Sequence, residues 1–293
     1  MAETVYGVKS PSHDNKLSVA PSVLFSFGDS SNPSVTAIGT VFLGDTGVDI
    51  DGLALSRSQG LFGFALGGSD ASPSSLLVGI NTATAEASAI GGVLYGREIR
   101  GGMFDSSNRL WAIDGYANTL LHISQTTGAI LSEVALTLDG DPLSVLRGSD
   151  IVQAMDGTVF FSSYDPAFGV GGSNTLYTLN LSSGATAIAF RDSAPDNEVA
   201  NLPLYTTGLA AGSGATADYL FGLDGDGFED IFTYVRPDFT RTEVLSNILA
   251  YTPNSGGLDL ASLAPLADVP EPATLALLAL GTAGLIGARR RRS

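Results

Sequence analysis

The chain contains no cysteine and has only two histidines, His13 and His122. Disulfide bonds, thiol catalysis and every metal site built from cysteine are therefore excluded. Charged residues are also scarce, at 15% of the 293 residues, which excludes a charge-rich disordered chain. Basic residues are the scarcest charge: 14 Lys and Arg stand against 30 Asp and Glu, a formal net charge of −16. A nucleic-acid partner requires a basic surface, so no nucleic acid is expected to bind.

Glycine is abundant instead, with 36 residues, and 22 of the 30 acidic residues are aspartate. Aspartate favours turns because its short carboxylate accepts hydrogen bonds from nearby backbone N–H groups. A chain rich in Asp, Gly and Ser, with little Lys and Glu, is typical of short strands joined by many turns. The composition therefore predicts an all-β body.

Four segments of the chain share one layout of four strands, in which an aromatic residue leads the second strand. They occupy residues 50–90, 99–136, 149–190 and 207–249. Their opening residues are 49, 49 and 58 positions apart: Gly52, Gly101, Asp150 and Gly208. A period near 50 residues with Gly-rich turns favours a β-propeller of five or six blades over residues 1–255. A repetitive β-sandwich or a solenoid is the alternative.

Three details of the repeats carry further expectations. The turns at residues 80–87, 123–130 and 179–186 occupy the same place in three units. The aromatic residues that lead the strands are expected to pack between blades rather than to line a ligand site; they are Phe62, Trp111, Phe160 and Phe221. Residues 5–39 look like a fifth unit that lacks its opening strand, and residues 258–263 are positioned to supply it. Residues 256–268 otherwise read as a linker.

The C-terminus from Val269 has three consecutive parts. The residues Val269, Pro270, Glu271 and Pro272 come first; the prolines keep this stretch extended. Residues 273–288 follow as 16 uncharged, helix-compatible positions, about 24 Å long as a helix against about 30 Å for a bilayer core. Four arginines end the run: Arg289, Arg290, Arg291 and Arg292. The positive-inside rule keeps them cytoplasmic, so the body lies outside. A buried C-terminal helix with a basic end is the alternative.

This order of parts resembles the PEP-CTERM protein-sorting domain of Gram-negative bacteria, over residues 269–293. The resemblance implies a signature motif at 269–272, a membrane helix at 273–288 and a basic stop at 289–292. It also implies recognition by an exosortase, cleavage near the motif after transient anchoring in the inner membrane, and delivery to the cell surface. The family is associated with extracellular polysaccharide and the biofilm matrix.

Proteins of this kind normally begin with a secretory signal. The first residues, MAETVYGVKSPSHDNKLSV, contain no basic stretch followed by an apolar run of 7–15 residues. Because Val5–Val8 already read as the inside of a strand, we expect the true start to lie upstream of Met1.

Candidate catalytic groups are few. His13 lies in a polar loop, His122 is expected to face outward from a strand, and neither forms a recognisable zinc pair or Ser-His-Asp triad. Glycoside hydrolysis needs two carboxylates at a set separation, and four aspartates lie near strand ends: Asp105, Asp114, Asp150 and Asp156. Each also sits beside Gly, Ser or Asn, as ordinary turn aspartates do. No catalytic residue is therefore assigned.

The metal candidate is the loop from Leu223 to Asp230. Alternating carboxylates with glycine between them can surround one hard cation such as Ca²⁺. The loop resembles the calcium loops of FG-GAP repeats, with Asp224, Asp226 and Asp230 at three ligand places and Gly222 at a fourth that lacks its ligand. A plain Asp-Gly hairpin is the alternative.

Two classes of function remain open from the sequence. The first is a non-catalytic surface or matrix protein that binds polysaccharide or another surface protein. The second is a secreted carbohydrate-active enzyme. A central pocket with two carboxylates and stacked aromatic rings favours the enzyme, whereas a channel lined by small residues favours the binding protein.

Overall fold

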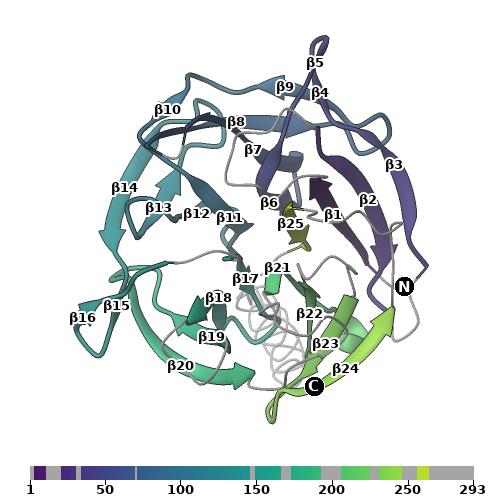
Figure 1. Ribbon diagram of the computed structural model, residues 1–293. Helices are drawn as coiled ribbons and strands as arrows, with labels where there is room; N and C mark the ends of the chain where they lie inside the picture. Colours follow the sequence, from purple (N-terminus) through teal and green to yellow (C-terminus); the bar gives the residue numbers. More distant parts are fainter. Residues whose placement is uncertain are drawn as a thin grey trace, which may run out of the picture.

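The structure is a computed structural model that describes residues 3–10, 21–30, 34–69, 71–145, 149–165, 173–192, 206–224, 231–245 and 256–263. Within these ranges the chain forms 25 β-strands and one short 3₁₀ turn, η1 (Gly214–Thr216). The prediction of an all-β body with almost no helix is confirmed. The described strands make five sheets, named A to E in chain order, arranged around a common axis as in a propeller (Figure 1).

Sheet A joins the two ends of the described chain. Its order is β25–β1–β2–β3, with β25 (Gly256–Ala261), β1 (Thr4–Ser10), β2 (Val23–Gly28) and β3 (Thr36–Thr40). The strand β25 pairs antiparallel with β1, so that Ala261 lies opposite Tyr6 and Asp259 lies opposite Val8. The expectation that residues near 258–263 complete the first unit is therefore confirmed.

Sheets C and E are each built from one continuous segment, in four antiparallel strands. Sheet C contains β11 (Ile99–Phe104), β12 (Leu110–Asp114), β13 (Thr119–Ile123) and β14 (Ile130–Ala135). Sheet E contains β21 (Thr206–Ala211), β22 (Tyr219–Asp224), β23 (Ile231–Val235) and β24 (Thr240–Leu245).

Sheets B and D have the same four-strand layout and carry an additional hairpin. The four strands of sheet B are β6 (Ile50–Ser56), β7 (Gly60–Ser69), β8 (Ser72–Ile80) and β9 (Glu86–Ala89), and those of sheet D are β17 (Ile151–Gln153), β18 (Val159–Asp165), β19 (Ser173–Leu179) and β20 (Ala185–Asp192). The hairpin of β4 (Phe42–Leu43) and β5 (Thr46–Gly47) pairs parallel with β9. The hairpin of β15 (Thr137–Leu138) and β16 (Asp141–Pro142) pairs with β20 in the same way. A short strand, β10 (Leu94–Tyr95), pairs with β8. Both hairpins therefore cover a sheet edge that would otherwise be open.

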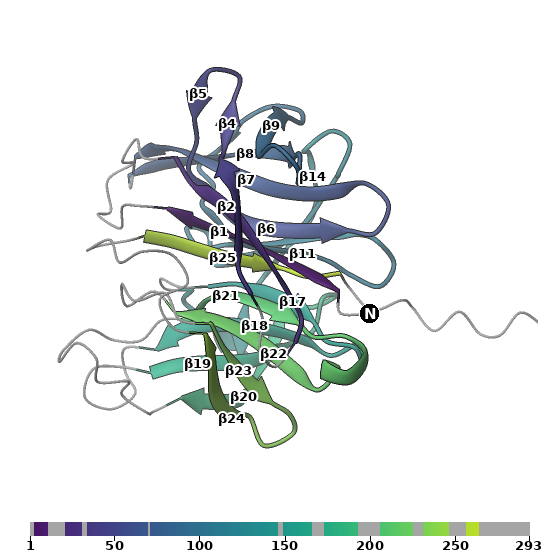
Figure 2. The ribbon, with the colours of Figure 1, turned by 90° about the vertical axis from the view of Figure 1, so that its right-hand side faces the viewer.

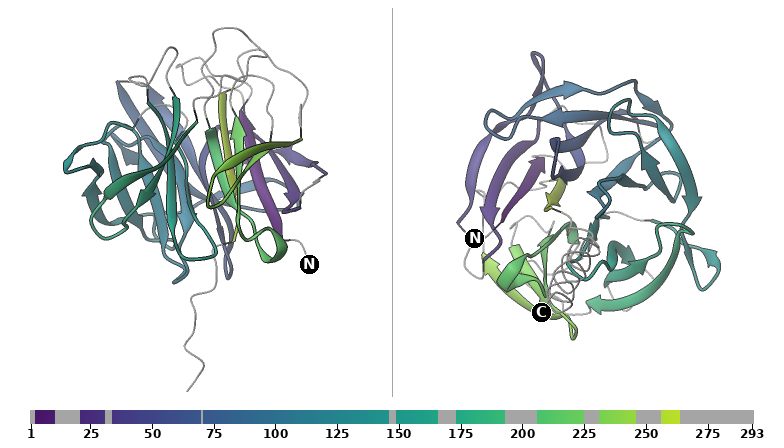
Figure 3. Two further views of the ribbon diagram at one scale, coloured as in Figure 1. Left: turned by 90° about the horizontal axis from the view of Figure 1, so that it is seen from below. Right: turned by 180° about the vertical axis from the view of Figure 1, so that it is seen from behind.

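The innermost strands form a ring around the axis, in the order β25, β6, β11, β17 and β21, with each strand contacting the next. Figure 1 shows these five labels around the centre, and the view from behind in Figure 3 shows the same ring. From the side, β25 lies between β1 and β21 (Figure 2). Four of the five inner strands contain Gly or Ala, since neighbouring strands enclose them closely, whereas the outer strand β14 is mostly exposed.

Five hydrophobic clusters fill the spaces between neighbouring sheets in the described part of the chain. Phe62 of sheet B, for example, packs against Phe104 of sheet C, and Phe221 of sheet E packs against Phe27 of sheet A. Trp111 and Phe160 are buried in the same manner. The prediction that the leading aromatic residues pack between sheets is confirmed.

The three turns that the sequence aligns do share one geometry. Each begins with a polar side chain that accepts a hydrogen bond from a backbone N–H two or three residues later: Asn81, Ser124 and Asn180. Four residues after it, the backbone has a positive φ of 61°, 67° and 70°, at Ala85, Gly128 and Gly184 respectively. This conformation favours glycine, so Ala85 is the unusual residue of the three.

One predicted boundary is wrong. Residues 256–268 were expected to be a linker, but residues 256–261 form β25, because the exposed edge of β1 supplies a partner for their backbone groups. The predicted membrane helix at 273–288 lies outside the described residues. In the ranges that the structure describes, no helix has the length and hydropathy needed to cross a membrane.

Candidate functional site

The opening positions of the five inner strands meet at one end of the axis. A Cβ on Gly101 would lie 2.6 Å from the Cα of Asp150, and a Cβ on Gly208 would lie 3.0 Å from the Cα of Asp259. A Cβ on Gly52 would lie 3.4 Å from the backbone carbon of Gly101. The glycines are therefore needed because the backbones of neighbouring strands touch here. Only the aspartates extend side chains from these five positions.

Asp150 stands immediately before β17, at the inner edge of sheet D, and is fully buried. One carboxylate oxygen accepts a hydrogen bond from the backbone N–H of Ile151 at 2.6 Å. The other accepts one from the backbone N–H of Leu209, on β21 of the next sheet, at 2.5 Å. The side chain therefore joins sheet D to sheet E.

Asp259 repeats this arrangement on β25. It is fully buried, and one oxygen accepts a hydrogen bond from the N–H of Leu260 at 2.8 Å. The other accepts a short hydrogen bond from the N–H of Leu53, on β6. Asp259 therefore joins sheet A to sheet B. In both cases the donor follows one of the axial glycines, Gly52 or Gly208, in the sequence.

The two aspartates also contact each other. Their carboxyl groups share a hydrogen bond, and Asp51 on β6 lies close enough to interact electrostatically with both. Burial raises the pKa of Asp150 to about 8, against hydrogen bonds from Asp259 and from the N–H groups of Leu209 and Ile151 that lower it. Burial, followed by the charge of Asp150, raises the pKa of Asp259, and burial with Asp49 and Asp259 raises that of Asp51. The pair is therefore expected to hold a proton at neutral pH.

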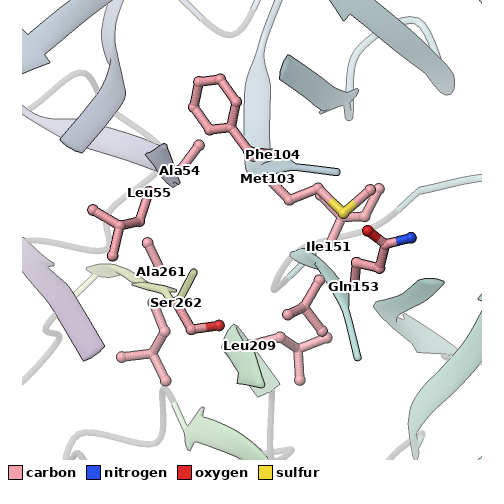
Figure 4. A pocket seen from close by; sticks show the side chains of 12 residues that line it. Ala54, Leu55, Met103, Phe104, Ile151, Gln153, Leu209, Ala261 and Ser262 are labelled. Atoms are coloured by element: carbon pink, nitrogen blue, oxygen red, sulfur yellow. The ribbon is translucent and has the colours of Figure 1, made fainter. Parts of the chain in front are cut away.

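Further along the axis the ring surrounds a small cavity of about 10 Å³, room for about one water molecule. Figure 4 shows that its walls are aliphatic side chains such as Leu55, Ile151 and Leu209, with Phe104 and the polar Gln153 and Ser262 among them. No carboxylate and no stacked pair of aromatic rings lines it. The cavity is therefore neither the central pocket with two carboxylates that favours an enzyme nor a channel lined by small residues.

The carboxyl arrangement is poorly suited to glycoside hydrolysis. Retaining enzymes hold their two carboxyl groups about 5–5.5 Å apart, and inverting enzymes about 6.5–9.5 Å apart, so that the sugar or a water fits between them. Asp150 and Asp259 are in direct hydrogen-bond contact and are fully buried. No substrate atom fits between them.

The other three candidate aspartates lie apart from the axis. Asp105 follows β11 and accepts hydrogen bonds from Arg109 and from the indole N–H of Trp111. Burial opposes its ionisation, but these bonds outweigh burial and lower the pKa of Asp105. Asp105 therefore fixes the turn before β12.

Asp114 ends β12 and is fully buried. It accepts hydrogen bonds from the backbone N–H groups of Glu98, Tyr116 and Ala117 and from Arg97. Asp156 is an exposed turn residue that bonds Arg236 of sheet E at 2.6 Å. Both aspartates have the structural role that is typical of turn residues, and the structure brings neither to Asp150.

His122 lies on β13, with its ring stacked on Trp111 at 4.9 Å between centroids. It is half-buried rather than fully outward-facing, and burial together with the charge of Arg109 lowers the pKa of its imidazole. The other histidine, His13, lies outside the described residues.

Of the calcium candidates, only the backbone of Asp224 at the end of β22 is described, and Asp226 and Asp230 lie outside the described residues. In the described ranges no cluster of three or more His, Asp or Glu side chains is arranged to hold a metal ion. The calcium loop stays a prediction.

Two of the three axial carboxylates, Asp51 and Asp259, were not among the sequence candidates. The series Gly52, Gly101, Asp150, Gly208 continues to Asp259 after 51 further residues. One further repeat period after Gly208 leads to Asp259, on the strand that closes the ring. The repeat spacing is therefore the signal that could have identified Asp259. Asp51 stands next to Gly52 and carries no comparable signal.

Comparison with known families identifies a PEP-CTERM protein-sorting motif at residues 268–292. The chain therefore carries this sorting signal, which includes Val269–Pro272 and Arg289–Arg292. The matched segment is outside the residues that the structure describes. No curated protein matches the chain.

Solved structures resemble the body in fold. A structural genomics protein of unknown function from Bacteroides thetaiotaomicron is 13% identical, with a TM-score of 0.50 over 89% of this chain and 72% of that one. A protein of unknown function from Bacteroides caccae is 9% identical, with a TM-score of 0.46 over 88% of this chain and 99% of that one. At such low identity the likeness concerns the fold alone.

Proposed function

We propose that this protein is exported and sorted by an exosortase to the cell surface or extracellular matrix of a Gram-negative bacterium, where its body serves as a non-catalytic binding or structural module. The body is a propeller of five blades, one for each sheet. The segment 273–288 anchors the chain transiently in the inner membrane, and Arg289–Arg292 stop it there. Processing occurs near Pro270–Pro272.

The sorting motif at residues 268–292 is the observation that carries this proposal. Its position relative to the fold supports it as well. The ring is closed by β25, which ends at Ala261, so every described strand precedes the motif. Cleavage near Pro270–Pro272 would leave the whole ring intact.

The axis supports a body without catalysis. Its cavity has room for about one water molecule, and its buried carboxyl pair is in direct contact. The alternative, a secreted carbohydrate-active enzyme, requires an open site with separated carboxylates. No feature of the described axis favours that alternative.

Sheet D carries a groove whose lining suits a neutral polysaccharide. It encloses about 560 Å³ and is lined by residues of β18, β19, β20 and their turns. The lining contains hydroxyl and amide side chains and no charged one; the polar members include Thr158, Thr178, Asn180, Ser182 and Thr186. Sugar hydroxyls pair with such donors and acceptors. The chain as a whole is acidic, so this uncharged groove favours a neutral ligand over an anionic one.

Intact-mass measurement on protein from the native host tests the sorting proposal. The wild-type chain is expected in the surface fraction with a mass below 30.0 kDa, because residues after the cleavage point are removed. A variant with Pro270→Ala and Glu271→Ala is expected to keep its full C-terminus and to stay with the membrane. A wild-type chain that ends at Ser293 and remains in the cytosol would refute the proposal.

A further inference from the structure

The buried carboxyl pair on the axis joins strands that come from distant parts of the chain. Asp150 connects β17 to β21, and Asp259 connects β25 to β6, through backbone N–H groups of Leu209 and Leu53. Because the two carboxyl groups also bond each other, this pair links four of the five inner strands. The fifth, β11, touches Asp150 through Gly101.

The charged groups around the pair are mostly acidic. Asp51 on β6 faces both aspartates, and Asp49 and Glu98 act on Asp51 from the segments before β6 and β11. Arg100 on β11 opposes them, but its guanidinium is bonded to Glu98 at 2.7 Å. Lys9 on β1 lies opposite Leu258, so it projects from the other face of sheet A than Asp259 does. No charged side chain belongs to β17, and none belongs to β21.

We propose that the Asp150–Asp259 pair is a proton-dependent latch on the closing strand β25. While Asp150 is protonated, no charge is buried at this position, and both of its oxygens accept their backbone N–H bonds. When Asp150 loses its proton, a carboxylate is left in a fully buried space next to Asp51, and the folded ring is destabilised, although Asp259 keeps its own proton and donates to that carboxylate. The strand that yields is β25, because it comes from the opposite end of the chain to its partner β1 and no turn holds the two together.

The direction of the pH effect follows from linkage. A buried Asp150 with a pKa of about 8 is protonated in the folded chain, while in the unfolded chain it ionises near pH 4. Between these values unfolding releases a proton, so the stabilising contribution is complete below about pH 4 and is lost as pH rises to about 8. Over that window the unfolding equilibrium constant rises about tenfold per pH unit for this pair. Mildly acidic surroundings therefore tighten the ring, and alkaline ones loosen it.

Hydrogen exchange on the full 293-residue chain in a mild detergent tests the latch. After correction for intrinsic exchange rates, the protection of Leu260 and Ala261 in β25 is expected to fall at least tenfold between pH 6 and pH 9. The protection of Leu120 and Leu121 in β13 is expected to stay constant. An Asp150→Asn variant keeps an acceptor for the N–H of Leu209 but has no proton to lose at this position, so its β25 protection is expected to be nearly independent of pH.

Two variants make the result decisive. Asp150→Ser also lacks the titrating carboxyl group, is expected to behave as Asp150→Asn does, and serves if the latter does not fold. Asp156→Asn removes an exposed aspartate outside the pair and is expected to keep the wild-type pH dependence. The latch is overturned if wild-type β25 is equally protected at pH 6 and pH 9, or if the folded Asp150 variants retain the wild-type fall.

Discussion

Sheets A and C have the same four-strand layout, but the chain supplies them differently. Sheet C is one continuous segment in which each strand pairs with the next along the chain. Sheet A takes its inner strand from residues 256–261 and its other three strands from residues 4–40. The same four-strand layout can therefore be built from one continuous segment, as in sheet C, or from two segments far apart in the sequence, as in sheet A.

The electrostatics of the two sheets differ in the same sense. In sheet C, Arg109 bonds Asp105, and Arg97 bonds both Asp114 and Glu133. The hydrogen bond from Arg97 lowers the pKa of Glu133, so this carboxylate is stable in its ionised form. At the inner strand of sheet A, Asp259 instead meets another carboxyl group, and burial raises its pKa. Ion pairs between opposite charges therefore stabilise sheet C, whereas the inner strand of sheet A is held by a hydrogen bond between two carboxyl groups.

Truncation is expected to have the largest effect and to separate the two ways of building a sheet. A chain that stops after residue 255 lacks β25, so β1 loses its partner, and the buried Leu260 and Ala261 leave two inter-sheet cores. We expect it to lose its cooperative thermal transition, followed by circular dichroism. A chain that stops after residue 263 keeps β25 and is the matched control. Similar melting temperatures for both chains would show that β25 does not close the ring.

A turn substitution in sheet C is expected to have the next largest effect. In Gly128→Ala, the new Cβ would lie 2.5 Å from the carbonyl oxygen of Ile90, at a residue whose φ is 67°. Left-handed strain alone costs about 1–2 kcal/mol, and the clash raises the loss of unfolding free energy to about 3 kcal/mol. Urea denaturation measures it.

The matched control for that substitution is Ala85→Gly, at the equivalent turn of sheet B with a φ of 61°. Relief of strain there is offset by loss of a buried methyl group, so its unfolding free energy is expected to change by under about 1 kcal/mol. A loss as large as that of Gly128→Ala would contradict the equivalence of the turns.

The charge difference predicts opposite pH behaviour in the two regions. Asp105→Asn weakens the hydrogen bonds from Arg109 and Trp111 and is expected to cost about 1–2 kcal/mol at pH 7. The pKa of Asp105 is lower in the folded chain than in the unfolded chain, where it is about 4. Its stabilising contribution is therefore fully present above about pH 4 and is lost as the pH falls through the folded-state pKa. The difference between variant and wild type should therefore shrink at low pH in urea denaturation. A difference that grows at low pH would reverse the assigned sign.

The smallest effect is expected where sheets D and E meet at the surface. Asp156 is 54% exposed and bonds Arg236 across the two sheets. Exposed ion pairs contribute about 0–1 kcal/mol, so Asp156→Ala should change the unfolding free energy by less than about 1 kcal/mol. The same measurement in 0.5 M NaCl should reduce even that difference, since salt screens exposed charges. A loss above about 2 kcal/mol would place this pair among the main inter-sheet contacts.

The features of the fold that could be predicted are those written in local patterns. Turn residues such as Asn81, Ser124 and Asn180 determine where strands end, and the aromatic residues mark the buried faces between sheets. The repeat period then gave four units, each of which forms four strands of one sheet. The missing inner strand of the fifth unit could be predicted because every unit of a closed ring needs an inner strand.

The axial pair could not be predicted because its partners are set by three-dimensional closure. In the sequence, Asp105, Asp114, Asp150 and Asp156 look alike, since each stands beside a turn residue. Which backbone N–H groups reach each carboxylate depends on the neighbouring sheet. Asp259 lies on the strand that was expected to complete the first unit, but it was not among the four candidate aspartates.

The strand β25 also has a consequence for the order of folding. The pairing of Tyr6 with Ala261 joins residues 255 positions apart, so sheet A has a far longer contact range than sheet C. Contacts between distant residues form slowly, because the chain must first lose the entropy of closing a long loop. Sheets B to E can therefore assemble from local hairpins while sheet A waits for its inner strand.

The order of synthesis determines when sheet A can be completed. Residues 256–261 are made after every other described strand, and the sorting motif begins at residue 268, seven positions after Ala261. The ring cannot close until nearly all of the chain ahead of the motif has been delivered. Completion of the fold and availability of the sorting signal are thereby separated by only a few residues of synthesis.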